Sequence, residues 1–170
     1  MGTAEATGTR LMAYRLFWIC FATVLVADQL SKIAIVEWSG FQQGLYPPFD
    51  GLPIIPGYFN LVYAINYGAA WGMFAGLSWL LISLAFAVLI FIWFFRNSLE
   101  LKHPRLQVCF GLMCAGIVGN TIDRISRGHV VDFLDVHLQF YRWPTFNFAD
   151  SAIVVGTLFY LLLQFKPARA

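Results

Sequence analysis

Four long runs of apolar residues divide the chain, at residues 16–36, 77–95, 106–125 and 148–164. A helix needs about 17–25 predominantly apolar residues to cross a hydrocarbon core of ~30 Å, and each run falls in that range. The pattern therefore predicts an α-helical integral membrane protein with four transmembrane helices, in which residues 1–170 form one membrane-embedded domain.

The segments outside these runs are more polar or richer in turns. Residues 1–15 form a polar N-terminal tail. Residues 37–76 contain no Lys or Arg and are interrupted by Pro and Gly turn signals, the first at Pro47-Pro48. Within them, YFNLVYAIN at 58–66 is aromatic and β-branched with a loose alternation, which is typical of a strand. We expect a small β-sheet on the membrane surface.

Charged residues are distributed unevenly between the two sides that four crossings define. The positive-inside rule places the more basic side in the cytoplasm. That side holds seven of the eleven basic residues, Arg10, Arg15, Arg96, Lys102, Arg105, Lys166 and Arg169. Both termini are then cytoplasmic. All acidic residues except Glu5 and Glu100 lie toward the outer face, together with residues 37–76.

The composition supports a membrane domain and excludes other classes. Hydrophobic residues make up 59% of the chain and charged residues only 12%, which is about half the share of an ordinary soluble domain. No run of basic residues could follow a phosphate backbone, so we expect no nucleic-acid partner. The three cysteines lie within apolar runs, where buried thiols are expected rather than a disulfide framework.

Residues 119–151 join the third and fourth runs and hold four of the nine acidic residues. Carboxylates at or near a membrane are costly unless they are paired or functional. Asp132 lies in VVDFLDV, whose Val and Phe side chains would partly desolvate it and raise its pKa. A second carboxylate nearby, Asp150, would raise that pKa further, so that the pair holds one proton.

Such a pair can hydrolyse a peptide bond without a metal, a cofactor or a covalent intermediate. One carboxylate activates water as a general base while the other, protonated, polarises the scissile carbonyl. The roles reverse when the tetrahedral intermediate collapses. Asp132 and Asp150 are therefore the candidate catalytic residues.

These residues also have simpler interpretations. Asp150 follows Asn147 by three residues, and Asn147 suits the N-cap of the fourth helix. A carboxylate in the first turn is favoured by the helix dipole whatever its function. His129 and His137 flank Asp132 and offer zinc binding as an alternative, but their spacing matches no recognised pattern, and we expect no metal.

Further polar side chains lie near the ends of the first and third runs. Asp28 and Lys32 are four residues apart, on one helix face. We expect an ion pair that snorkels near the helix end, or one that supports the site. Asn120, Asp123 and Arg124 also share a helix face, and we expect Asp123 to pair with Arg124 as a scaffold.

Two more polar residues keep open interpretations. Asn66, at the end of the predicted strand, could donate hydrogen bonds to a substrate backbone or belong to a turn. Asp135 is the rival of Asp132. It is expected on the opposite face of the extended segment, or solvated, and therefore structural.

Five short motifs together resemble those of the lipoprotein signal peptidases, or signal peptidase II. They are DQLSK (28–32), NYGAAWG (66–72), GNTIDR (119–124), GHVVDF (128–133) and FNFADSA (146–152). The motifs occur in that family's order, and the resemblance extends over residues 16–165.

The resemblance implies an aspartyl protease of the bacterial inner membrane, with four helices and an outer β-cradle. That family removes the signal peptide of prolipoproteins just before the diacylglyceryl-modified cysteine. Motif position makes Asp132 and Asp150 the catalytic pair. It gives supporting or substrate-binding roles to Asp28, Lys32, Asn66, Gly116, Asn120, Asp123, Arg124, Asn147 and Ala149. It also implies inhibition by globomycin-type peptides, and nothing in the sequence requires more than a monomer.

Two other function classes stay open on the sequence. A small ion- or proton-coupled transporter would use the intramembrane charges, although these gather at one face and no inverted repeat is visible. A structural membrane subunit would use the acidic residues only as helix caps.

Overall fold

The computed structural model describes residues 13–44, 51–138 and 140–165. Most of the predicted N-terminal tail, and the predicted turn at Pro47-Pro48, lie outside these residues. The elements in chain order are α2 (Arg15–Ile33), a π-helical turn η1 (Ala34–Trp38), β1 (Gly51–Ile55), β2 (Phe59–Asn66), η2 (Ala70–Gly72), α3 (Ser78–Phe95), α4 (Pro104–Arg127), β3 (Val130–Leu138), β4 (Tyr141–Arg142) and α5 (Phe148–Gln164).

Four apolar helices confirm the prediction of a helical membrane protein. Three are long and apolar enough to cross a membrane: α2 with η1, α3, and α4. The fourth, α5, has 17 residues. At 1.5 Å per residue it extends over about 26 Å, close to the thickness of a hydrocarbon core. Helix boundaries lie within two residues of the apolar runs, because hydrophobic length is a local property of the sequence.

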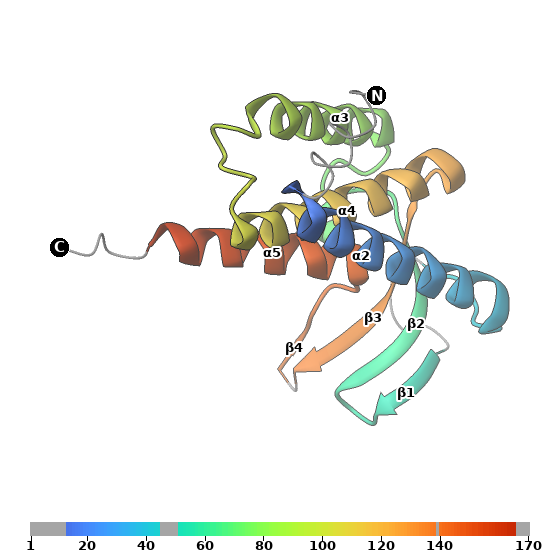
Figure 1. Cartoon of the computed structure of the whole chain (residues 1–170). Coiled ribbons are helices and arrows are strands. Elements are labelled where there is room, and N and C mark those ends of the chain that lie inside the picture. Colours follow the sequence, from blue (N-terminus) through green and yellow to red (C-terminus); the bar gives the residue numbers. More distant parts are fainter. Residues whose placement is uncertain (1–12, 45–50, 139, 166–170) are drawn as a thin grey trace.

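The central helix of the bundle is α4. It packs along α5 and α2 and more lightly against α3, which lies apart from those two helices (Figure 1). A core cluster forms around Cys109, Phe110 and Cys114 of α4. By contrast, α3 buries only Ile92. Such an apolar, unburied helix fits contact with lipid.

The helices alternate in direction, so different helix ends meet at each end of the bundle. One end holds the start of α2 and the connection between α3 and α4. The other end holds the ends of α2 and α4 and the start of α5, and the sheet extends from it (Figure 1). Gly128, with φ of 78°, ends α4 and turns the chain into β3.

The β-sheet has four antiparallel strands in the order β1-β2-β3-β4. The prediction for residues 58–66 is confirmed by β2. Half of the sheet, however, comes from the segment after α4, so residues 37–76 do not form it alone. The sequence pattern does not predict β1, because Pro53 within it argues against a strand. As an edge strand, β1 tolerates that proline.

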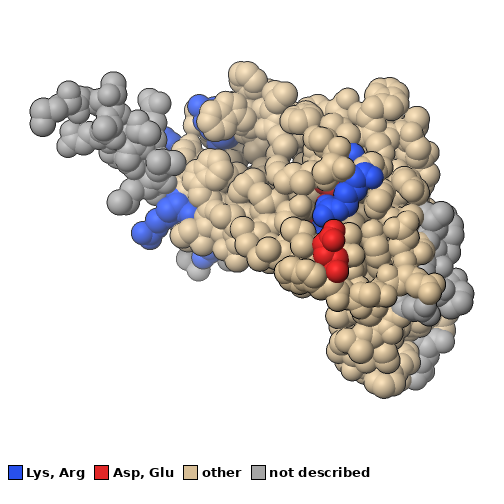
Figure 2. Space-filling view, turned by 90° about the vertical axis from the view of Figure 1, so that its right-hand side faces the viewer, with Lys and Arg blue, Asp and Glu red and all other residues tan. Residues whose placement is uncertain are grey.

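The surface at the sheet end of the bundle carries few charges. Figure 2 views this end and shows mostly uncharged residues, with basic and acidic side chains side by side near its centre. The acidic residues predicted toward this end are largely inside the protein. Asp28, Asp123, Asp132 and Asp135 each expose at most 1% of their surface. Buried carboxylates require partners, and those partners define the site.

Candidate active site

Asp132 is the most buried carboxylate of the predicted pair. It lies on β3 opposite Ala64 of β2, and 1% of its surface is exposed. The side-chain amide of Asn66, at the end of β2, donates a hydrogen bond of 3.1 Å to its Oδ2. Burial raises the pKa of the Asp132 carboxyl well above its ordinary value. The charge of Asp150 raises it further, and the amide of Asn66 opposes the rise.

Asp150 lies in the first turn of α5 and closes a capping box with Asn147. Its backbone N–H donates to Asn147 Oδ1 at 2.9 Å, and the Asn147 N–H donates to Asp150 Oδ2 at 3.3 Å. Asp150 Oδ1 accepts a hydrogen bond of 2.7 Å from Asn120 Nδ2. The cap and the contact with α4 use different oxygen atoms. A capping role for Asp150 therefore does not exclude a chemical one.

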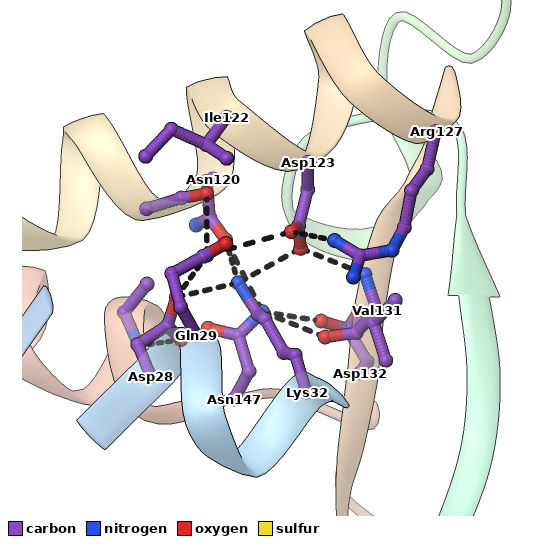
Figure 3. Close-up of polar contacts among 12 residues, drawn as sticks. Asp28, Gln29, Lys32, Asn120, Ile122, Asp123, Arg127, Val131, Asp132 and Asn147 are labelled. Carbon is purple, nitrogen blue, oxygen red and sulfur yellow. Dashed lines mark hydrogen bonds and ion pairs between the residues drawn. The ribbon is translucent and has the colours of Figure 1, made fainter. Parts of the chain in front are cut away.

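Two asparagine side chains connect the carboxylates of Asp132 and Asp150, and we call them the amide bridge. Asn147 Nδ2 donates to Asp132 Oδ1 at 2.7 Å and to Asn120 Oδ1 at 3.2 Å (Figure 3). Asn120 in turn donates to Asp150. The tertiary structure thus brings the two predicted carboxylates into one hydrogen-bonded chain from β3, through α4, to α5.

Behind the amide bridge lies a fully buried charge network. Lys32 Nζ is 2.9 Å from Asp28 Oδ2 and 2.9 Å from Asp123 Oδ2, and none of the three side chains is exposed (Figure 3). The predicted pairing of Asp28 with Lys32 is confirmed, but the expectation that it snorkels is wrong. Helix α4 packs against α2 here and supplies a second carboxylate, so the ammonium is satisfied inside the protein.

The predicted pairing of Asp123 with Arg124 is wrong. Adjacent helical residues point about 100° apart, so their side chains do not meet. Asp123 pairs instead with Lys32 and with Arg127, which lies one turn further along α4. The guanidinium of Arg124 donates to the backbone oxygen of Gly68 at 2.8 Å. This bond fixes the loop after β2 against α4.

Small residues allow the three site helices to approach closely. A Cβ atom at Gly116 would collide with the backbone oxygen of Ala149, and one at Gly119 would lie 2.6 Å from Asp28 Oδ2. The N–H of Ala149 donates to Asp28 Oδ1 at 2.9 Å. Gly116 and Ala149 carry no reactive group, and their contacts show that they set the spacing of α4 and α5.

Asp135 belongs to a separate cluster on the other face of β3. Arg142 donates to its two oxygens at 2.9 and 2.6 Å, and His137 and Asn60 also contact it. Burial alone would raise the pKa of Asp135, but these hydrogen bonds hold it below its ordinary value. Asp135 is not solvated. His137 contacts Asp135 and not Asp132.

A zinc site at Asp132 therefore finds no support in this geometry. The two histidines that flank Asp132 in sequence take other partners: His137 meets Asp135, and the ring of His129 packs edge-on against Tyr67. Within residues 13–44, 51–138 and 140–165, no three His, Cys, Asp or Glu side chains form a group that could hold a metal ion.

Sequence reasoning missed two members of the buried network. Gln29 Nε2 donates to Asp28 Oδ2 at 3.1 Å and to the backbone oxygen of Gly119 at 3.3 Å. Arg127 forms an ion pair of 2.9 Å with Asp123. Both had a signal in the sequence, since Gln29 lies inside the motif DQLSK and Arg127 follows Asp123 by four residues.

The chain matches known proteins in both sequence and fold. The family model described as Signal peptidase (SPase) II matches residues 20–166. The chain belongs to the signal peptidase II family. Membership confirms the prediction made from the five motifs, which all lie within the matched residues.

Individual relatives match most of this signal peptidase II. The lipoprotein signal peptidase of Syntrophotalea carbinolica is 37% identical over 161 residues, which cover 92% of this chain and 95% of the relative. That of Symbiobacterium thermophilum is 43% identical over 132 residues, with 78% and 82% covered. A solved bacterial membrane enzyme superposes with a TM-score of 0.77 at 28% identity, covering 89% of this chain and 92% of that one.

The distribution of charge in this signal peptidase II also bears on the transporter alternative. Helix α3 carries no charged residue, and those of α4 and α5 lie near the helix ends. A transporter would be expected to place ionisable groups along a path through the bilayer. In the part of the chain that the structure describes, the buried charged groups gather at the sheet end of the bundle instead, and Arg96, Lys102 and Arg105 lie at the opposite end.

Proposed function

We propose that this signal peptidase II is an aspartic endopeptidase that removes the signal peptide from diacylglyceryl-modified prolipoproteins, cutting just before the lipidated cysteine. The observation that supports it most is the connection of Asp132 to Asp150 through the amide bridge. Two carboxylates in electrostatic contact favour a state in which they share one proton.

The two carboxylates differ in their surroundings, and this assigns their roles. Asp132 is fully buried, and burial raises the pKa of its carboxyl, so we assign the shared proton to Asp132. Asp150 is partly exposed and closer to water. Asp150, ionised, accepts a proton from water while the water oxygen attacks the scissile carbonyl carbon. Asp132 gives its proton to the carbonyl oxygen, which yields a tetrahedral diol.

Collapse of the diol reverses both transfers. Asp150 gives the proton to the amide nitrogen, and the C–N bond breaks to release the amino group of the lipidated cysteine. Asp132 takes a proton back from the diol hydroxyl as the carboxyl group of the signal peptide forms. Atoms and charge balance with one water consumed. The chain's own groups supply every proton transfer.

The remaining residues hold this geometry. Asn120 and Asn147 orient the two carboxylates, while Asp28, Lys32 and Asp123 fix α2 against α4.

The positive-inside rule supports a protein of the inner membrane with both termini in the cytoplasm and the carboxylates at the outer face. Substrate then arrives within the bilayer, and globomycin-type peptides compete with it for the carboxylate pair. A monomer suffices, since one chain supplies both carboxylates.

The test is cleavage of a lipidated precursor and of its unmodified counterpart by the purified enzyme. We expect Asp132→Asn and Asp150→Asn each to lower the rate at least ~1,000-fold, because each removes one member of the proton-transfer pair. The matched control is Glu37→Gln, an exposed carboxylate at the same end of the bundle. It should cleave like the wild type.

Three outcomes would contradict the proposal or a part of it. Full activity in either single variant, with correct membrane insertion, would remove the carboxylate pair from the mechanism. Loss of activity with a strong chelator would point to a metal instead. Equal rates on lipidated and unmodified precursors would leave the peptidase but overturn the substrate assignment.

A further inference from the structure

We infer that Lys32 is the positioning residue that fixes the Asp132–Asp150 pair at one proton, through charge balance and through the orientation of Asn120. The inference rests on the proposed function, because it takes these two carboxylates as the reacting pair. It concerns how the pair keeps its one shared proton, which the pair's own geometry does not explain.

The ammonium group of Lys32 has three hydrogens and three partners. Its Nζ lies 2.9 Å from Asp28 Oδ2, 2.9 Å from Asp123 Oδ2 and 3.1 Å from Asn120 Oδ1. The side chain has no exposed surface. A buried cation is retained only when it is paired and fully hydrogen-bonded, and Lys32 meets both conditions.

Lys32 also decides which way the Asn120 amide points. An ammonium group can only donate, so it requires the oxygen of the amide on its side. The same oxygen accepts from Asn147 Nδ2 at 3.2 Å. The NH₂ group of Asn120 must then face Asp150, to which it donates at 2.7 Å. A neutral, apolar side chain at position 32 would leave this amide free to turn over.

The charges of the cluster balance only when the carboxylate pair carries one proton. The cluster contains four carboxylates and three cations, which contact one another or interact electrostatically. The carboxylates are those of Asp28, Asp123, Asp132 and Asp150, and the cations are Lys32, Arg124 and Arg127. Full ionisation leaves one unbalanced negative charge inside the protein, and one proton removes it. Without Lys32, the carboxylate pair would need two protons to balance the charges of the cluster. Without Asp123, it would need none.

Other titratable groups around the cluster do not alter this balance at neutral pH. His129 interacts with Asp123 and Arg127, but burial lowers the pKa of its imidazole, which leaves it neutral. Tyr63 of β2 is neutral as well, since burial raises its pKa. Glu37 is exposed to solvent, where its charge is screened.

The test compares the pH dependence of kcat/KM in three variants. Lys32→Met should move the pH optimum upward by about one unit or more, because the pair then favours a second proton. Asp123→Asn should move it downward by a similar amount, since one negative charge is lost. The double variant should return the optimum close to that of the wild type, although its rate is reduced.

A purely structural role for Lys32 predicts a different result. It would lower the rate at every pH and leave the optimum in place in all three variants, and that outcome overturns the inference. Lys32→Arg, which keeps the charge, serves as the conservative control and should keep the optimum. Thermal unfolding in detergent identifies any variant that fails to fold.

A second measurement separates this inference from the proposed function, because it does not need activity. The infrared carbonyl stretch of a protonated carboxyl group, assigned by its loss in Asp132→Asn, reports the shared proton directly. We expect it to persist to higher pH in Lys32→Met and to vanish at lower pH in Asp123→Asn. If these shifts occur but no precursor is cleaved, the proposed function fails, while the control of the shared proton by Lys32 stands. An unmoved band overturns the inference alone.

Discussion

At the scale of single residues, Asn147 serves the fold and the site with different atoms of one amide. Its Oδ1 accepts from the Asp150 N–H and caps α5, while its Nδ2 donates to Asp132 and Asn120. The two functions can be separated, because capping requires only an acceptor and the bridge requires a donor.

We therefore predict different effects for two substitutions of Asn147. Asn147→Ser keeps a capping oxygen and Asn147→Ala does not, so the Ser variant should be more stable by about 1 kcal/mol. Both lose the amide NH₂ group that donates to Asp132 and Asn120 and should lose activity to the same degree. Thermal unfolding and precursor cleavage, measured on the same preparations, decide this. Retained activity in Asn147→Ser alone would show that the cap, and not the bridge, matters.

At the scale of elements, the two ends of the bundle are fixed by different means. The sheet end is held by the buried charges. At the opposite end, buried Gln107 of α4 accepts from the N–H groups of Leu16 and Phe17 at 3.1 and 3.4 Å, and so caps α2. It also donates to the backbone oxygens of Ala13 and Lys102. One amide thus joins α2, α4 and the loop before α4.

Gln107→Leu is expected to destabilise the protein by about 2–4 kcal/mol, because it removes the hydrogen bonds of a buried amide to four partly buried or exposed backbone groups. The site lies at the other end of α4, so the pH optimum of any remaining activity should stay unchanged. Gln42→Leu, at an exposed position, is the matched control and should have little effect on unfolding. A shifted optimum in Gln107→Leu would show that the two ends are coupled.

At the scale of the whole molecule, charge is sorted along the bundle axis. Arg96, Lys102 and Arg105 lie at the end with the α3–α4 connection, while the buried acids lie at the sheet end. Insertion across a membrane with a cytoplasmic excess of basic residues then has one favoured orientation. The carboxylate pair faces the outer side in that orientation.

Cysteine labelling in whole cells tests this orientation. In a background with Cys20, Cys109 and Cys114 replaced by Ala, a membrane-impermeant thiol reagent should label Glu37→Cys and not Lys102→Cys. Both positions are exposed, so access from one side of the membrane decides the result. Permeabilised cells, in which both should react, supply the control. Labelling of Lys102→Cys in intact cells would reverse the topology.

Much of this protein was determined locally by its sequence. The apolar runs gave the four helices, because hydrophobic length decides membrane spans without reference to other segments. Asn147 and Asp150, three residues apart, gave the start of α5, because a capping box is formed within one turn. The ion pair of Asp28 with Lys32 followed from their spacing on one helix face.

The tertiary structure decided the partners of each charged group. Lys32 meets Asn120 across 88 residues, and Asp28 meets the N–H of Ala149 across 121 residues. Asp123 takes Lys32 of α2 rather than its neighbour, and Asp132 and Asp150 meet through two amides. Spacing along one helix cannot reveal such contacts. They depend on how closely α2, α4 and α5 approach, and that is set by small residues whose effect exists only once the helices pack.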